Sequence, residues 1–253
     1  SRSFVEHLLP MKNTTTALIF GLAIVLAALA LGNAFKNRNR TAGDIYVTGL
    51  GQADFTSDLI VWEGRFGAMD RDLKQAYVTL ERNKAIIREY LVGKGIPEDK
   101  LVFSAVRTNQ RNKALYSPDG DYMGEEFVGY ELSQSLTVES PEVEQIERIS
   151  REVTELLNQG VQFYSDAPRY YYTKLGELKI EMISKATEDA RVRAEQIATN
   201  AGSRLGDLRS ASMGVFQITG QNSDEEYSWG GTFNTSDRDK TASITVKLEY
   251  EVE

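Results

Sequence analysis

The chain has 253 residues, a formal net charge of −8 at pH 7, no cysteine and a single histidine, His7. An acidic balance argues against non-specific binding to nucleic acid, which needs clustered Lys and Arg. The absence of cysteine excludes disulfides, thiolate chemistry and zinc or iron–sulfur sites that cysteine would bind. Because no histidine follows residue 7, Ser-His-Asp triads are excluded in the main body of the chain. We therefore expect no cofactor, no metal, no nucleic-acid partner and a protein that is not an enzyme.

The first strong feature along the chain is an uncharged apolar run at residues 17–35. As a helix it rises about 28 Å, close to the ~30 Å hydrocarbon core of a bilayer. We interpret it as a transmembrane anchor between an N-terminal segment, residues 1–16, and a basic linker, residues 36–43. The anchor side chains are Ala17, Leu18, Ile19, Phe20, Leu22, Ile24, Val25, Leu26, Leu29, Leu31 and Phe35.

A cleaved signal peptide is the alternative interpretation of this run, because Lys12 precedes it and small residues lie near its end. The length of the run favours an uncleaved anchor, as do Lys36, Arg38 and Arg40 directly after it. Counted alone under the positive-inside rule, these charges would leave the following domain in the cytoplasm.

Residues 44–253 alternate between strand and helix signals, which predicts an α+β domain. Residues 109–126 are polar and contain a Pro-Asp-Gly turn, so we expect a loop or hairpin tip there. The other predicted elements up to residue 164 are strands at 45–49, 58–67, 101–107, 127–138 and 161–164, and helices at 70–91 and 141–159.

The order strand–helix–strand occurs twice, at 58–107 and at 127–164. Two such units in series are typical of a ferredoxin-like βαββαβ layer, with helices on one face of an antiparallel sheet. We expect this layer to be extended by a long helix at 175–201 and by C-terminal antiparallel strands, around 214–218 and at 244–252. Residues 220–239, rich in Gly, Ser, Asn and Asp, predict a mobile loop.

The long helix carries small residues four positions apart, which allow a close approach of another backbone. Packing on the helix's own sheet is the favoured interpretation, and contact with another subunit is the alternative. The residues concerned are Ala186, Ala190, Ala194 and Ala198. The acidic and basic residues of the same helix predict a solvated face of ion pairs, including Glu181 with Lys185 and Asp189 with Arg193.

An aromatic and basic cluster precedes the long helix. Tyr and Arg are common at interface hot spots, although a strand with alternating core and rim tyrosines explains the pattern too. The cluster consists of Tyr164, Arg169, Tyr170, Tyr171 and Tyr172.

Two glycine pairs suggest a phosphate-binding loop: Gly49 with Gly51, and Gly230 with Gly231. Neither has the surrounding residues of a dinucleotide or P-loop motif, so we interpret all four as turn glycines.

Several short motifs occur in one order over about residues 45–252. They are Val47-Thr48-Gly49-x-Gly51, Gly129-Tyr130, Gly160 before Val161-Gln-Phe, the alanine helix with Asp189-Ala190 inside it, Leu205-Gly206 and the terminal alternating strand. In this order they resemble the SIMPL-domain family, which includes bacterial periplasmic immunogenic proteins and proteins named for oxidative-stress defence. The run at 57–62 and Gly214-Val-Phe-Gln-Ile resemble a membrane-anchored subgroup of Bacteroidota-type bacteria.

The resemblance implies export, homo-oligomers that are ring- or channel-like in at least some members, and no set of catalytic residues. With it, we expect a single-pass protein of the bacterial inner membrane with its domain in the periplasm, or a cleaved periplasmic form. The expected function is an envelope-anchored, self-assembling, non-enzymatic structural or binding protein, linked to envelope or oxidative stress defence.

Two alternatives remain open at this stage. The first is a small-ligand sensor, or a carboxylate- or Tyr-dependent enzyme, with a pocket near Tyr164–Tyr172. The second is an adaptor that docks another envelope protein through residues 220–239.

Overall fold

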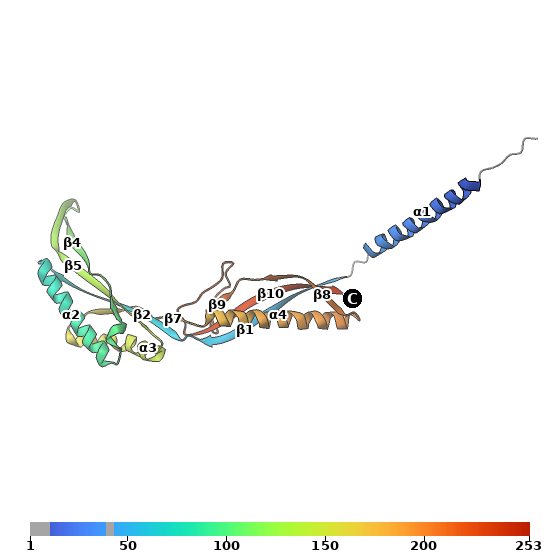
Figure 1. Cartoon of the computed structure of the whole chain (residues 1–253). Coiled ribbons are helices and arrows are strands. Elements are labelled where there is room, and N and C mark those ends of the chain that lie inside the picture. Colours follow the sequence, from blue (N-terminus) through green and yellow to red (C-terminus); the bar gives the residue numbers. More distant parts are fainter. Residues whose placement is uncertain (1–10, 39–42) are drawn as a thin grey trace, which may run out of the picture. The chain divides into compact units, whose positions relative to one another are not determined.

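The structure, a computed structural model, describes the backbone of residues 11–38 and 43–253 and, in the first helix, the side chains of residues 17–33. It is a mixed α+β chain with four helices in this described part (Figure 1). The helices are α1 (Met11–Arg38), α2 (Leu73–Gly93), α3 (Val143–Glu152) and α4 (Leu175–Asn200), with 3-10 segments η1 (Glu98–Lys100) and η2 (Val153–Gln159). The strands are β1 (Asp44–Thr56), β2 (Leu59–Asp70), β3 (Leu101–Phe103), β4 (Arg107–Tyr116), β5 (Tyr122–Ser140), β6 (Phe163–Ser165), β7 (Arg169–Tyr171), β8 (Leu205–Met213), β9 (Gln217–Gly220) and β10 (Asp239–Val252).

Backbone proximity divides the chain into two units. The first comprises the described residues up to Tyr46, Ala194–Ser210 and Glu249–Glu253, and the second comprises Val47–Arg193 and Ala211–Leu248. Within the first unit, the Arg209 guanidinium lies 2.7 Å from Glu251 and 3.3 Å from Asp44.

The sheet in the middle of the chain has the strand order β3-β5-β2-β6, with β4 paired to β5 and β7 paired to β2. Every second residue of β2 from Ile60 to Phe66 is buried, so one face of this part of the strand faces the core. Trp62 and Phe66 on this face belong to one buried cluster with Leu80 and Ile87 of α2 and Ile149 of α3. The two predicted amphipathic helices therefore pack on the same core as the buried face of β2.

The ends of these helices follow local signals in the sequence. The Asp72 side chain accepts hydrogen bonds from the backbone N–H groups of Lys74 and Gln75, at 2.8 and 3.1 Å, and so caps the start of α2. At Gly160, which follows η2, the backbone is left-handed with φ of 77°.

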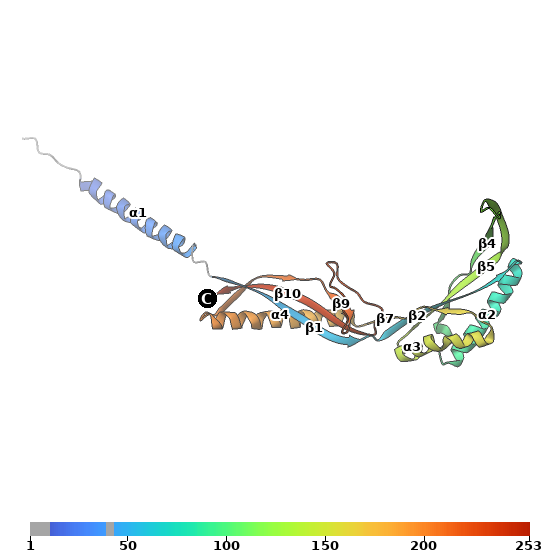
Figure 2. The ribbon, with the colours of Figure 1, turned by 180° about the vertical axis from the view of Figure 1, so that it is seen from behind.

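The other sheet has the order β1-β10-β8, with β9 also paired to β10. Figures 1 and 2 show α4 running alongside β1 and β10. The approach of α4 to β1 is very close, because a β-carbon at Gly49 would lie 2.0 Å from the Ala186 carbonyl oxygen. One at Gly51 would lie 2.1 Å from the carbonyl oxygen of Met182.

The interpretation of Gly49 and Gly51 as turn glycines is therefore wrong. Both lie inside β1, two residues apart and hence on one face of the strand. Their lack of a side chain is what allows the α4 backbone to rest on this strand. Gly231 does have the positive φ of a turn residue, 92°.

The expected transmembrane segment is not supported. Among the described residues, no helix is both long enough and apolar enough to span a membrane. The described side chains of α1, residues 17–33, are exposed; Phe35, also assigned to the anchor, lies outside the described side chains.

Of the two expectations for residues 109–126, a loop or a hairpin tip, the structure shows the hairpin: β4 and β5 pair in a register that continues to Tyr116 opposite Tyr122. One further expectation needs correction. The strand expected around 214–218 is interrupted, so that β8 ends at Met213 and β9 begins at Gln217. Polar residues obscured the hairpin in the sequence because both of its faces are exposed there.

The glycine contact predicts the effect of Gly49→Ala. The added methyl group would overlap the α4 backbone, and we expect unfolding to become easier by about 3 kcal/mol, within the range for overpacked sites. Urea denaturation followed by circular dichroism measures this change. Gly176→Ala in α4 is the control, since no heavy atom lies near its β-carbon position; equal stabilities of the two variants would contradict the contact.

Asp189 predicts a pH dependence of stability. Its carboxylate accepts a hydrogen bond from the Leu50 backbone N–H at 2.8 Å and lies 3.0 Å from Arg193. The Leu50 N–H first, and Arg193 second, lower the pKa of this carboxyl group. The stability it contributes is thus complete above the unfolded-state pKa, about 3.9, and is lost as pH falls through the lower folded-state pKa.

We therefore expect Asp189→Asn to be less stable than the native chain at pH 7, with the difference shrinking in acid. Urea denaturation between pH 7 and pH 3 measures it, with Glu177→Gln on the same helix as the control. A difference that is constant over this range would show that the carboxylate charge does not hold β1 to α4.

Candidate binding site

The predicted aromatic cluster is divided by the fold. Tyr164 on β6 is 62% exposed, whereas Tyr170 on β7 is buried. Burial first, and Glu147 second, raise the pKa of Tyr170. The Tyr172 ring packs against Phe55 at 4.8 Å between centroids, and Arg169 forms an ion pair with Glu63. The alternation of core and rim tyrosines therefore describes these residues better than a single cluster does.

Tyr164 does line an open groove of about 650 Å³ on the sheet. Arg65, Arg107 and Glu131 line it too. Arg65 already lies 2.8 Å from Asp166, and Glu131 pairs with Arg111. Most of the charge in this groove is thus neutralised by neighbours within the chain.

The alanine stripe of α4 is covered within the chain itself. Ala186, Ala190, Ala194 and Ala198 are all at most 1% exposed. The first two face the glycines of β1. This burial agrees with packing of α4 on its own sheet. The alanine stripe is therefore not available to another molecule, and a binding surface has to lie elsewhere on the chain.

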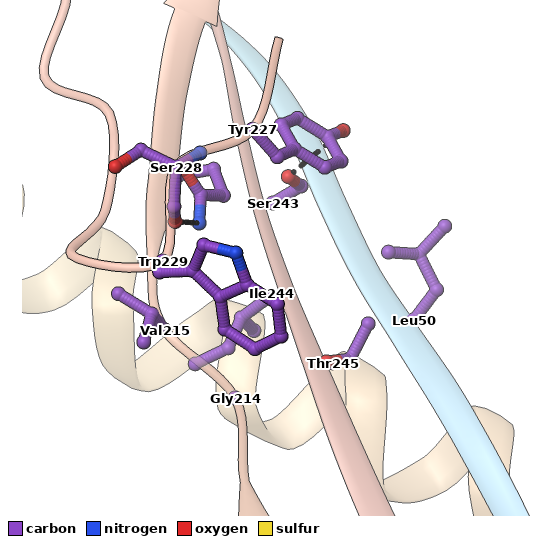
Figure 3. A pocket seen from close by; sticks show the side chains of 10 residues that line it. Leu50, Gly214, Val215, Tyr227, Ser228, Trp229, Ser243, Ile244 and Thr245 are labelled. Carbon is purple, nitrogen blue, oxygen red and sulfur yellow. Dashed lines mark hydrogen bonds between the residues drawn. The ribbon is translucent and has the colours of Figure 1, made fainter.

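A second cavity, of about 360 Å³, lies where β1 and β10 meet the loop after β9. Figure 3 shows the Trp229 indole over Val215 and Ile244, with Leu50 on the other side of the opening. Trp229 is 100% exposed and Tyr227 65% exposed. We call this site the Trp229 cavity; it is lined by Leu50, Gly214, Val215, Gln217, Tyr227, Ser228, Trp229, Ser243, Ile244 and Thr245.

The fold explains why the Trp229 cavity is open. Leu50 lies between Gly49 and Gly51 in β1, and successive side chains of a strand point to opposite faces. Because the glycines face α4, Leu50 faces away from it. The cavity therefore lies on the face of the sheet that α4 leaves uncovered.

Buried polar side chains hold the loop that carries Trp229. Gln217 is 8% exposed; its Nε2 donates to the Ser228 carbonyl at 2.8 Å, and its Oε1 accepts from the Thr232 N–H at 2.7 Å. Further along the loop, the Asn234 side chain donates to Glu225 and Asp237, both at 2.8 Å. The loop predicted to be mobile is thus tied down at two points, and the backbone on both sides of Trp229 is held by hydrogen bonds.

A buried lysine ties this region to β7. Lys240 is 2% exposed, and its ammonium group donates to the Tyr170 carbonyl at 2.6 Å. Burial lowers the pKa of Lys240, and Asp237 and Glu225 oppose that shift. The Tyr170 N–H in turn donates to the Thr235 carbonyl at 2.8 Å, so the loop after β9 is anchored at both of its sides.

The sequence analysis missed the Trp229 cavity. The signal that was available is a Tyr-Ser-Trp run inside a polar, glycine-rich segment. Two aromatic residues are unexpected in a segment of that composition. No group of three or more His, Asp or Glu side chains suited to a metal ion occurs in the part of the chain that the structure describes. Chemically, the Trp229 cavity offers apolar and aromatic surface with hydroxyl groups at its edge, which suits a non-covalent apolar contact.

A family model described as SIMPL, "Protein of unknown function (DUF541)", covers residues 45–252. No curated protein matches the chain significantly.

The Gln217 contacts predict the behaviour of Gln217→Ala. Without this side chain the Ser228 carbonyl and the Thr232 N–H lose their buried hydrogen-bond partner. The loss of the partner destabilises the folded loop by about 1–3 kcal/mol. Hydrogen exchange of residues 226–232 should then be at least about tenfold faster, while α4 stays protected. Mass spectrometry resolves both regions, and Gln221→Ala, at an exposed position of the same loop, is the control; unchanged exchange would mean that other contacts hold the loop.

Proposed function

We propose that this chain, which belongs to the SIMPL family, is a non-enzymatic binding protein that assembles with copies of itself. The observation that carries the proposal is the Trp229 cavity, an apolar site with a fully exposed indole. Exposed apolar patches on soluble domains mark sites of interaction, and Trp and Tyr dominate the energy of protein interfaces. The fixed loop supports a contact role because a segment whose backbone is already ordered loses less entropy on binding.

We also propose that the protein acts in the bacterial cell envelope, with residues 44–253 in the periplasm. The resemblance of the motifs to exported proteins supports this location, as do the exposed apolar side chains of α1, since apolar surface of this size is normally covered by lipid or protein. A link to envelope or oxidative stress defence belongs to the same proposal and rests on the family resemblance.

We further infer that β2, α2, β3, β5, α3 and β6 form the ferredoxin-like layer expected from the sequence. The strand order β3-β5-β2-β6 supports it, as do the antiparallel pairings of β5 with β3 and β2 and of β2 with β6. This layer provides a rigid platform for the long hairpin of β4 and β5.

Binding of a small ligand is the second candidate function. The groove beside Tyr164 favours it, because its volume lies within the usual range of ligand sites, roughly 300–1,000 Å³. Its arginines would suit an anionic ligand. Ligand binding is the weaker candidate for two reasons. Arg65 already pairs with Asp166, and the groove lies on an open sheet face.

The mass of the purified full chain in a mild detergent tests self-assembly. Mass photometry and light scattering from nanomolar to about 20 μM protein should show species heavier than one chain, increasing with concentration. A single-chain mass throughout this range would contradict the proposal. Detergent-only samples and a chain with scrambled residues 17–33 separate domain contacts from association through α1.

A further inference from the structure

Two exposed aromatic rings border the Trp229 cavity. Trp229 is 100% exposed and Tyr227 65% exposed, and both line the same opening (Figure 3). The Ser243 hydroxyl donates to the Tyr227 hydroxyl at 3.2 Å and so holds that ring at the edge of the cavity. None of the ring contacts in the described part of the chain joins the two aromatic side chains. The faces of both rings are therefore open to a group from outside.

The loop that carries these rings is acidic. Residues 214–237 contain no Lys or Arg, and their four acidic residues are Asp224, Glu225, Glu226 and Asp237. No ion pair among the described residues engages any of these carboxylates. Two lysines of β10 lie nearby, the buried Lys240 and the exposed Lys247, which follows Thr245 on the same face of the strand. The surroundings of the cavity are net negative even with both lysines counted.

No cation of the described chain lies over Trp229 or Tyr227, although the chain uses such contacts elsewhere. Basic side chains lie 5.2–5.7 Å from the ring centroids of Tyr90, Phe103 and Phe216. Aromatic rings attract cations to their faces, and Trp does so most strongly. The acidic loop adds a Coulombic attraction. The two free rings and the carboxylates beside them therefore favour a cationic group.

The floor of the cavity suits the stem of a basic side chain. Val215 and Ile244 lie under the Trp229 indole, and Leu50 lies on the other side of the opening (Figure 3). Arg and Lys bury their methylene groups on such apolar surface and keep the charged end in water. The volume of about 360 Å³ is near the lower end of the range for ligand sites, roughly 300–1,000 Å³. The cavity is therefore matched to one long side chain and not to a folded segment.

The most basic segment of the sequence is the linker, residues 36–43. Lys36, Arg38 and Arg40 alternate with asparagines, and no other window of five residues holds three basic residues. No Asp or Glu occurs from His7 to Gly43, so neighbouring residues in the sequence do not offset this charge. The side chains of residues 36–42 lie outside the described residues. The linker thus has the sign of charge that the Trp229 cavity lacks.

From the opposite charges of these two regions we infer that a basic side chain of the linker of one copy enters the Trp229 cavity of a second copy. The inference rests on the self-assembly proposed above and names the chemistry that performs it. A guanidinium group stacks on Trp229, because its planar and weakly hydrated form suits an aromatic face better than an ammonium group does. Glu226 directly precedes Tyr227, and Asp224 lies two residues before Glu226; these exposed carboxylates attract the remaining charges of the linker.

A contact of this kind is head-to-tail. Each copy contributes a different surface, so a pair still has one free linker and one free cavity. The same contact can then repeat, which extends the assembly until it closes on itself or continues as a filament. Removing either surface from every copy should stop assembly at the single chain.

The first experiment compares full-length variants in a mild detergent. Trp229→Ser removes the cavity wall at an exposed position, and the linker variant carries Lys36→Gln, Arg38→Gln and Arg40→Gln before β1. Each should need at least about tenfold more protein than the native chain to associate, as expected for interface hot spots. The control carries the same loss of charge at three exposed positions of the domain, Arg82→Gln, Lys100→Gln and Lys174→Gln, and should assemble normally.

Mixing Trp229→Ser with the linker variant gives the decisive result. The first keeps an intact linker and the second an intact cavity, so an equimolar mixture should form dimers and nothing larger. No dimer in the mixture, or variants that assemble like the native chain, would overturn the inference while self-assembly still stands. A native chain that remains a monomer would overturn both.

A peptide of residues 36–42 tests the need for positive charge. The linker variant serves as the receptor, and its tryptophan fluorescence reports on Trp229 because Trp62 is only 1% exposed. The peptide should bind at least about tenfold more tightly than a neutral copy with citrulline for both arginines and acetyl-lysine for the lysine. Equal binding of the two peptides, or binding that survives Trp229→Ser in the receptor, would overturn the inference.

Crosslinking identifies the occupant directly. A photoreactive phenylalanine analogue at Val215, which lines the cavity and is 48% exposed, should capture residues 36–42 in cells. Copies with and without a heavy-isotope label show whether the captured segment comes from another copy. Capture of the linker of the same chain, of a different protein or of lipid would overturn the inference.

Discussion

The close contact between β1 and α4 is the constraint on which the rest of the second sheet depends. At Gly49 and Gly51, the absence of a side chain lets the helix backbone approach the strand, because a β-carbon at either position would overlap it. The small side chains of Ala186 and Ala190 meet them from the helix. Because this contact uses one face of β1, the residues between and beside the glycines must face the other way. An uncovered sheet face with Leu50 on it is thus a direct consequence of the glycine positions.

The uncovered face then receives a loop that the chain fixes with polar contacts. Gln217 and Asn234 are buried amides whose partners lie in this loop, and Lys240 links it to the Tyr170 carbonyl. Such interactions keep the loop in one conformation without covering its aromatic residues. The backbone that carries Trp229 is consequently ordered while the indole stays exposed, and these two properties allow a small surface to contribute strongly to binding.

Most elements were predictable from the sequence because their signals are local. The helical spacing of Leu80 and Ile87, and the alternation that ends in Val252, require only neighbouring residues and the usual periods of helices and strands. The family resemblance was also visible in short ordered motifs, and the match over residues 45–252 confirms it. Element ends were less accurate, and the sequence left a loop and a hairpin tip as alternatives at 109–126 because the hairpin of β4 and β5 has no buried face there.

The errors concern features that depend on distant residues. A glycine inside a strand looks like a turn glycine until the helix that touches it, more than 120 residues later, is known. The Trp229 cavity combines residues from β1, β10 and the loop after β9, and the loop's order depends on an amide at position 217. The apolar run at 17–35 was judged on length and lack of charge, which are not sufficient evidence for a membrane span.

The central claim is that assembly covers Trp229. The chain has two tryptophans, and Trp62 is only 1% exposed whereas Trp229 is fully exposed. Acrylamide quenching of tryptophan fluorescence therefore reports on Trp229, and it can be measured over the same protein concentrations as the mass. We predict that quenching falls as the single chain gives way to larger species. Equal quenching of the single chain and of its assemblies would contradict the account.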